Sequence, residues 1–311
     1  MSLARRNRAW NRLPALLLAA VCAAQAPAAD EVADTGKCLL WRVRSGSAAV
    51  YLLGSLHFGK PALYPLDPAI EKAFEASDFL VTEVNLNPAN QRKLDQLTTA
   101  RGVYPPGESL EQDVSPDTLR RLKAYLASRG MRLADVSRLR PWLVAMTLMQ
   151  QETMRAGFAP DLGLDKHFLK RAVAAKKPIL TLETVESQAA VLADGTAEEQ
   201  ELALRRMLDQ LPDLGEMMAA VTKAWQAGDA QAIDTLSRRY RSDDARLAPA
   251  LKRLRDDRNE RMAKKIEEFL ATDKTYFAVV GCMHLVGEQG IVRLLERRGS
   301  RIEQLDKARK R

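Results

Sequence analysis

Two copies of one four-residue pattern, G-x-x-H, lie at opposite ends of the chain and constrain its fold more than any other feature. They end at His57 and His284, and the whole sequence contains only three histidines. Each copy follows an apolar run of β-branched and aromatic residues, which predicts a strand that leads into the glycine. The glycines, Gly54 and Gly281, permit either an unusual φ or a close approach of other atoms. Because ligands gather beyond the carboxyl ends of strands in open α/β sheets, the two histidines are expected to share one site.

Strand-like segments cluster at the two ends of the chain, and a long helical middle separates them. The predicted strands cover residues 39–44, 50–53, 79–84, 178–182 and 276–280, with a short edge strand at 301–303. Apolar residues at helical spacing predict a helical middle at about 110–160 and 190–270, a helix opened by Asp67-Pro68 and another from Asp165 to Ala175. This order predicts an α/β (α+β) fold with a central mixed β-sheet, G-x-x-H turns at strand ends and a large helical insertion or cap.

The first 28 residues have the composition of a secretory signal peptide. Arginines come first, a short apolar stretch follows from Leu13 to Ala24, and small residues surround the expected cleavage point near Ala28. The apolar stretch is shorter than the roughly 20 residues that a membrane span needs. Residues 29–311 are therefore expected to form a single domain in the periplasm or outside the cell, with no membrane span after cleavage. A lipid anchor on Cys22 is the minor alternative.

The basic character of the chain comes largely from this leader, whose removal halves the formal net charge of +8. The remaining charged residues alternate in sign as on solvated helix faces, and no basic patch carries interleaved aromatics, so no nucleic-acid partner is expected. The oligomeric state stays open. Cys38 and Cys282 remain after cleavage, and the sequence is compatible with a disulfide between them or with two buried thiols.

Carboxylates follow two of the predicted strands. Glu83 and Glu183 each end an apolar run, and a carboxylate in such a place costs free energy unless it is paired, solvated or bound to a metal. Neutral imidazole and carboxylate groups are the ligands that hold a divalent metal while leaving positions open for water. The predicted metal ligands are therefore His57, His284 and Glu83. A solvated strand end is the alternative for the carboxylate.

Four further residues are open to a structural or a functional role. Asp165 begins a predicted helix, where helix capping is the simpler explanation. Arg258 and Asn259 lie in a late helix, either on a solvated face or in contact with an oxyanion or a substrate carboxylate. His167 has no comparable context and is expected at the surface or beside the site.

Signatures of other enzyme classes are absent from the sequence. It contains no G-x-S-x-G elbow, no P-loop, no G-x-G-x-x-G after a strand and no H-E-x-x-H motif. Ser55 and Cys282 each lie two residues before a motif histidine, which is poor geometry for a nucleophile and its base. His57 could still act as the base for Cys282 from across the cleft.

An ordered set of short motifs extends the pattern over residues 39–299. They are Tyr51–His57, the strand that ends in Glu83, Tyr104–Gly107, Arg140–Trp142, Gly163–Asp165, Leu182–Thr184 with Gln188, Arg258-Asn259 with Met262, and Val280–Gly287 with Gly290-Ile291. In content and order the set resembles the TraB/GumN family. Cys282 departs from the family pattern, in which a small residue such as alanine is more usual.

The resemblance implies a function. The family includes the Tiki proteins, metal-dependent proteases that trim the amino terminus of Wnt ligands, and it is related in fold to erythromycin esterase-like and haem-binding ChaN-like proteins. The resemblance implies His57, His284 and Glu83 as the metal site, with Arg258 and Asn259 as neighbours. It favours manganese or cobalt over zinc.

The function expected from the sequence is that of an exported metal-dependent hydrolase that cleaves a bond in a peptide or protein substrate. Glu83 would be a ligand or the general base, Glu183 or Asp165 would take the remaining role, and Arg258 would stabilise the oxyanion or hold a substrate carboxylate. Two other classes stay open. One is a non-catalytic protein that binds haem or a small ligand in the same crevice, and the other is an accessory protein whose motif histidines are hydrogen-bonded core residues.

Overall fold

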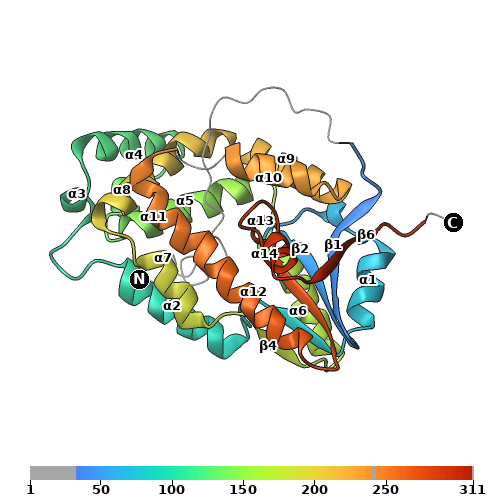
Figure 1. Cartoon of the computed structure of the whole chain (residues 1–311). Helices are drawn as coiled ribbons and strands as arrows, with labels where there is room; N and C mark the ends of the chain where they lie inside the picture. Colours follow the sequence, from blue (N-terminus) through green and yellow to red (C-terminus); the bar gives the residue numbers. More distant parts are fainter. Residues whose placement is uncertain (1–32, 240–242, 310–311) are drawn as a thin grey trace.

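The computed structural model describes residues 33–239 and 243–309, and a six-stranded mixed sheet lies at its centre (Figure 1). Across the sheet the strands are β4 (Ile179–Thr181), β3 (Phe79–Thr82), β5 (Thr275–Gly281), β2 (Ala48–Ser55), β1 (Lys37–Ser45) and β6 (Arg301–Asp306). The first four run parallel to one another, whereas β1 is antiparallel to both β2 and β6. The predicted strands and the α/β fold are thus confirmed. The predicted leader, including Cys22, lies outside the described residues.

Helices fill both intervals of the predicted helical middle. Their bounds are α1 Pro68–Glu75, α2 Pro88–Gly102, α3 Leu110–Asp113, α4 Pro116–Ser128, α5 Pro141–Arg155, α6 Leu164–Ala174, α7 Val185–Ala193, α8 Ala197–Gln210, α9 Leu214–Ala227, α10 Ala230–Arg239, α11 Ala248–Leu251, α12 Asp257–Leu270, α13 Cys282–Leu285 and α14 Ile291–Arg297. Over residues 33–239 and 243–309, no helix combines the length and the apolar content needed to cross a bilayer.

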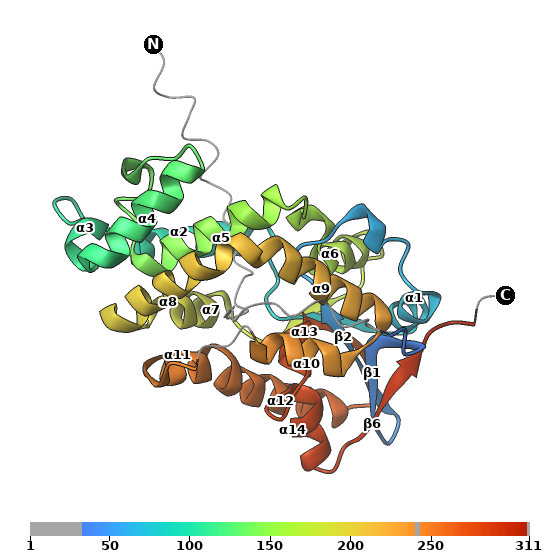
Figure 2. The same ribbon diagram turned by 90° about the horizontal axis from the view of Figure 1, so that it is seen from above.

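Aromatic side chains hold helices against both faces of the sheet. On one face, Phe277 of β5 contacts Phe74 of α1 and Phe168 of α6. On the other, Tyr276 of β5 stacks on Phe269 of α12 at a ring distance of 4.6 Å. Figure 2 shows α6 and α12 on opposite sides of β2. Neighbouring residues of one strand therefore point to opposite faces, and both faces of the parallel strands are covered.

The remaining helices gather beside the sheet. In Figures 1 and 2, α2 to α5, α7, α8 and α11 form a block on one side of it. From this block α5 contacts α9, and α9 in turn contacts β1. Trp225 of α9 donates a hydrogen bond from its indole nitrogen to the carbonyl oxygen of Gly54 at 2.5 Å. The helical middle thus reaches the first G-x-x-H motif directly.

Both cysteines of the described chain are free and buried. Burial raises the pKa of Cys38 to about 12, with the nearby Asp67 carboxylate adding to the effect, and burial likewise raises the pKa of Cys282 to about 12. The sequence was compatible with a disulfide or with two buried thiols, and in the structure Cys38 and Cys282 are two buried thiols.

Iodoacetamide at pH 8 is expected to leave both thiols of native residues 29–311 unmodified, because a thiol with a pKa near 12 is only about 10⁻⁴ ionised at that pH and the thiolate is the reactive form. Intact-mass measurement would show two added groups only after unfolding in guanidinium. Rapid alkylation of the native protein would contradict the burial, and no alkylation after unfolding without reductant would reveal a disulfide instead.

Candidate active site

Four of the predicted site residues follow the parallel strands at one edge of the sheet. His57 lies two residues after β2, Glu83 directly follows β3, and Glu183 comes two residues after β4. His284 lies in the short helix α13, which follows β5. Since these four strands are parallel neighbours, their carboxyl ends lie at the same edge. The prediction that both motif histidines stand just past strand ends at one edge is confirmed.

Gly281 marks the place where three of these side chains converge. A Cβ atom at this position would lie 3.3 Å from Glu83 Oε1, 3.4 Å from His57 Nε2 and 3.4 Å from His284 Cδ2. The space among the three groups therefore depends on the absence of a side chain at Gly281. The N–H of Gly281 also donates to Glu83 Oε1 at 2.8 Å, so the second motif fixes the carboxylate that follows β3.

Asp165 holds the first histidine. Its Oδ2 lies 2.7 Å from Nδ1 of His57, which leaves Nε2 directed to the shared space. The expectation that Asp165 caps a helix is wrong, because the cap position of α6 is Gly163 and the carboxylate is used on the histidine. A side chain at Gly163 would collide with the carbonyl oxygen of His57, only 2.3 Å from the Cβ position. That glycine therefore allows α6 to begin against the motif turn and bring its carboxylate within reach.

Asn259 holds the second histidine. Its Oδ1 lies 2.6 Å from Nδ1 of His284, and its amide nitrogen donates to the carbonyl oxygen of Gln289 at 2.6 Å. Because the amide nitrogen donates to a carbonyl, Oδ1 must accept a hydrogen bond from Nδ1–H of the histidine, and this assigns the proton of His284 to Nδ1. Nε2 of His284 then carries a lone pair.

Arg258 lies at the centre of the site with 2% of its surface exposed. Its guanidinium donates to Glu83 Oε2 at 2.7 Å and to Glu183 Oε2 at 2.5 Å, and one nitrogen lies 3.2 Å from His284 Nε2. The alternative of a solvated helix face is thus wrong for Arg258 and Asn259, which are both buried. The guanidinium faces protein carboxylates in this structure.

These contacts set the charge of each group. Burial lowers the pKa of His57, but the Asp165 carboxylate outweighs it and raises the pKa to about 9. Burial and the Arg258 charge lower the pKa of His284 to about 3, so this ring is neutral at pH 7. Burial opposes ionisation of Glu83, yet the surrounding positive charges lower its pKa to about 2. At neutral pH those charges are Arg258 and His57, because His284 is uncharged.

The donor set suits a divalent metal in its chemistry. Two imidazoles and a carboxylate surround one space, and each imidazole has its Nδ1 held by a hydrogen-bonding partner, as is usual for metal-binding histidines. As they stand, no three His, Cys, Asp or Glu side chains among residues 33–239 and 243–309 form a ready metal site. The guanidinium of Arg258 contacts Glu83 and His284 Nε2, two of the groups that an ion would need. The residues therefore fit a metal, provided that Arg258 withdraws from them.

His167 lies apart from this cluster. Its ring packs against Tyr64 and Phe168, with ring centres 5.0 Å apart in each pair. Burial, followed by the charge of Lys170, lowers the pKa of His167. It is the one histidine of the described chain without a contact to Arg258 or to the carboxylates of the site, so it provides a matched control.

Two cavities adjoin the cluster. One, of about 70 Å³, is lined by both motif histidines and by side chains of α5 and α9. The other, of about 270 Å³, is lined by Glu83 and Asp165 on the side of α6. Ser55, which the sequence suggested only as a poorly placed nucleophile, is one of the residues that line the smaller cavity, and its buried hydroxyl has no hydrogen-bond partner in the described structure.

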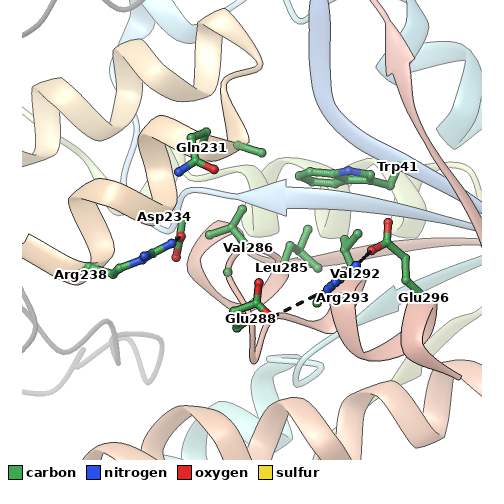
Figure 3. Close-up of a pocket in the computed structure, with 12 residues that line it drawn as sticks. Trp41, Gln231, Asp234, Arg238, Leu285, Val286, Glu288, Val292, Arg293 and Glu296 are labelled. Atoms are coloured by element: carbon green, nitrogen blue, oxygen red, sulfur yellow. Dashed lines mark hydrogen bonds and ion pairs between the residues drawn. The ribbon is translucent and has the colours of Figure 1, made fainter.

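A third cavity, of about 430 Å³, lies beyond the second motif (Figure 3). Trp41 covers one side of it, and its charged groups satisfy one another: Arg238 pairs with Asp234, and Arg293 pairs with Glu288 and Glu296. This cavity contains neither motif histidine and offers no unpaired charge to a ligand.

Fold and site together define an α/β protein with a His, Glu and Arg cluster at the carboxyl edge of its parallel strands. The chain belongs to the TraB/PrgY/gumN family, whose sequence profile matches residues 39–304. It is 26% identical over 147 residues to the uncharacterized protein YbaP of Escherichia coli (strain K12), a match that covers 47% of this chain and only about half, 53%, of that relative. It is 25% identical over 336 residues to the metalloprotease TIKI2 of Xenopus tropicalis, covering 87% of this chain and 62% of that protein. No solved structure shows a significant match.

The Asp165→Asn variant is expected to move the titration of His57 well below pH 9, because burial and Arg258 are then opposed by Glu83 alone. The pKa of His57 is about 9 in the folded protein and about 6.5 in the unfolded chain. Protonated His57 therefore stabilises the fold fully below about pH 6.5, and this contribution is lost as the pH rises through about 9. The variant should lack that pH dependence.

Nitrogen-detected NMR of the three histidine rings in metal-free protein measures this titration directly. His167 serves as the internal control, and its signal should titrate alike in both proteins. An unchanged His57 titration in Asp165→Asn would contradict the assignment.

The Arg258→Met variant is expected to lower the free energy of unfolding of the metal-free protein by about 3–5 kcal/mol, because it leaves Glu83 and Glu183 buried without their partner. Urea titration measures the change. Arg261→Met is the matched control, since Arg261 lies one turn away, 53% exposed and 4.0 Å from Glu183, and should cost less than about 0.5 kcal/mol. Equal losses in the two variants would contradict a central role for the Arg258 pairs.

Proposed function

We propose that this protein is an exported metal-dependent hydrolase that cleaves peptide bonds. The observation that carries the proposal is the convergence of His57 Nε2, His284 and Glu83 Oε1 around Gly281. A metal-dependent hydrolase is also supported by membership of the TraB/PrgY/gumN family and by the similarity to a protein named as a metalloprotease.

The residues of the cluster would have different roles, some binding an ion and others orienting the ligands. His57, His284 and Glu83 would hold the ion, because their free nitrogen and oxygen atoms face one space. Asp165 and Asn259 orient the two rings through Nδ1. A divalent ion in this place would polarise a carbonyl group and lower the pKa of a water molecule.

Arg258 and Glu183 would complete the reaction. Both carboxylates share one nitrogen of the guanidinium, so Glu183 lies beside Glu83 and is the carboxylate that can accept a proton from water when Arg258 turns toward substrate. The guanidinium would then stabilise negative charge on the oxygen of the scissile carbonyl. Asp165 is engaged with His57 and is not available as the base.

The ion is proposed to be manganese or cobalt, with zinc as the alternative, since imidazole and carboxylate ligands accept all three. The leader-like residues 1–28 support a periplasmic or secreted location, where the substrate would be a peptide or protein.

Residues 29–311, purified without a His-tag and loaded separately with manganese, cobalt and zinc, are expected to bind about one ion per chain by mass spectrometry. The His57→Ala/His284→Ala double variant should bind none and should lose cleavage of a peptide mixture, whereas His167→Ala should keep both. Asp165→Asn should bind the ion about 10–100-fold more weakly, because it loses the partner that orients His57.

Circular dichroism would show that the double variant is folded. Absence of bound metal in the unsubstituted protein would contradict the proposal, and a Soret band in place of metal would favour the non-catalytic haem-binding alternative.

A further inference from the structure

The cavity of about 70 Å³ beside the motif histidines has an apolar wall built by two helices of the helical middle. Helix α5 contributes Met149, and α9 contributes Leu214, Met217, Met218 and Val221. Phe58 and Met283, from the residues next to the two motif histidines, also line it, together with Leu56, Thr153 and Cys282. The ionisable groups of the lining are the two histidines and the Cys282 thiol, which burial keeps uncharged at neutral pH. The wall built by the two helices carries no charged side chain, so that wall favours an apolar occupant.

Ser55, with a buried hydroxyl, is one of the residues that line this cavity. Ser55 is 2% exposed, and its Oγ has no hydrogen-bond partner in the described structure. A buried hydroxyl without a partner costs free energy that a bound polar group would recover. Ser55 is paired in the sheet with Gly281, the residue on which the site converges, so such a group would lie beside the histidines.

We propose that this cavity binds the apolar side chain of the substrate residue next to the cleaved bond, while the Ser55 hydroxyl hydrogen-bonds to the main chain of that residue. The assignment of the occupant to a peptide rests on the proposed function. The cavity and the hydroxyl meet at the motif histidines, which is the arrangement that a residue flanking the reacting bond requires.

The size of the cavity selects the side chain. Because an apolar cavity of about 150 Å³ holds benzene, about 70 Å³ accommodates on the order of three non-hydrogen atoms, so a slightly larger side chain fits only if the wall adapts. Leucine, methionine and norleucine side chains have four such atoms, whereas an indole has too many. The four methionines in the wall, Met149, Met217, Met218 and Met283, are flexible enough to adapt to branched and unbranched chains.

Binding can be measured without catalysis. Metal-free residues 29–311 with ¹³C-methyl methionine would be titrated with capped amino acids, N-acetyl-X-methylamides with X as leucine, norleucine, alanine, glutamate or tryptophan. The leucine and norleucine ligands are expected to shift the methyl signals of Met149, Met217, Met218 and Met283 and to bind at least about tenfold more tightly than the alanine ligand, since each buried methylene strengthens binding about fourfold. Met131, Met154 and Met207, outside the cavity lining, should not shift.

Two variants test the parts of the proposal. Met218→Trp fills the cavity from a half-buried position and is expected to abolish the shifts, whereas Met154→Trp, at a side chain that is 50% exposed, should bind as the unsubstituted protein does. Ser55→Ala keeps the cavity and should weaken binding of every capped ligand by a similar factor. Equal binding of leucine and glutamate ligands, or shifts that survive Met218→Trp, would overturn the proposal.

Cleavage of a peptide mixture separates this inference from the proposed function. Cleavage that depends on His57 and His284 and is enriched for leucine, methionine or norleucine beside the bond supports both. Cleavage without that preference would contradict the assignment of the cavity and would still support the proposed hydrolase function. Selective leucine binding with no cleavage under any metal would retain the cavity as a ligand site and overturn the peptidase.

Discussion

The buried guanidinium of Arg258 is the interaction on which the site depends. Moving a charged group out of water costs several kcal/mol, and only close pairing compensates for that cost. A guanidinium can bridge two carboxylates because its donors fan out in a plane, which a lysine ammonium cannot reproduce. By pairing with Glu83 and Glu183, Arg258 joins α12 to the ends of β3 and β4, and its third contact reaches the second G-x-x-H motif. The late helix, two strand ends and the carboxyl-terminal motif are thereby fixed relative to one another.

The glycines of the site act by allowing close approach. Gly281 has a φ of −46°, which any residue can adopt, so the sequence alternative of an unusual φ does not apply there. A Cβ atom at this position would contact Glu83, His57 and His284 at 3.3–3.4 Å and would occupy the space among them. Gly163 has the same function on the other side, where α6 begins against the backbone of His57. Each contact places a polar side chain that is distant in sequence beside a motif histidine.

The sequence was sufficient to predict the strands, because strand patterns are local, and therefore the edge at which His57, Glu83, Glu183 and His284 stand. Local patterns were not sufficient to predict the partners that orient them, and only the family resemblance indicated Arg258 and Asn259 as neighbours of the site. Asp165 and His57 are 108 residues apart, and no periodicity reports such a contact. Helix α2 went unpredicted because most of its side chains are polar, with Leu94 the buried apolar residue. Arg258 lies in a stretch of alternating charge, which is typical of a solvent-exposed helix face. A π-helical segment, Lys252–Asp256, directly precedes its helix, and such a segment changes which residues face the protein interior.

The charge balance of the cluster links these contacts to the proposed chemistry. Glu83, Glu183 and Asp165 bring three carboxylates together, and Arg258 supplies one permanent positive charge. A proton on His57 offsets a second carboxylate, which is why its pKa is raised to about 9. If His57 gives up that proton to present its Nε2 lone pair, the cluster carries two uncompensated negative charges, which match the charge of one divalent cation. His57, His284 and Glu83 would therefore hold an ion with His57 deprotonated at Nε2 and with Arg258 displaced from Glu83 and His284. The ion would then compensate for Glu83, while the guanidinium would be free for the substrate and Glu183 free to act as the base. The charged residues that stabilise the cluster without an ion are therefore the ones that would allow it to accept an ion.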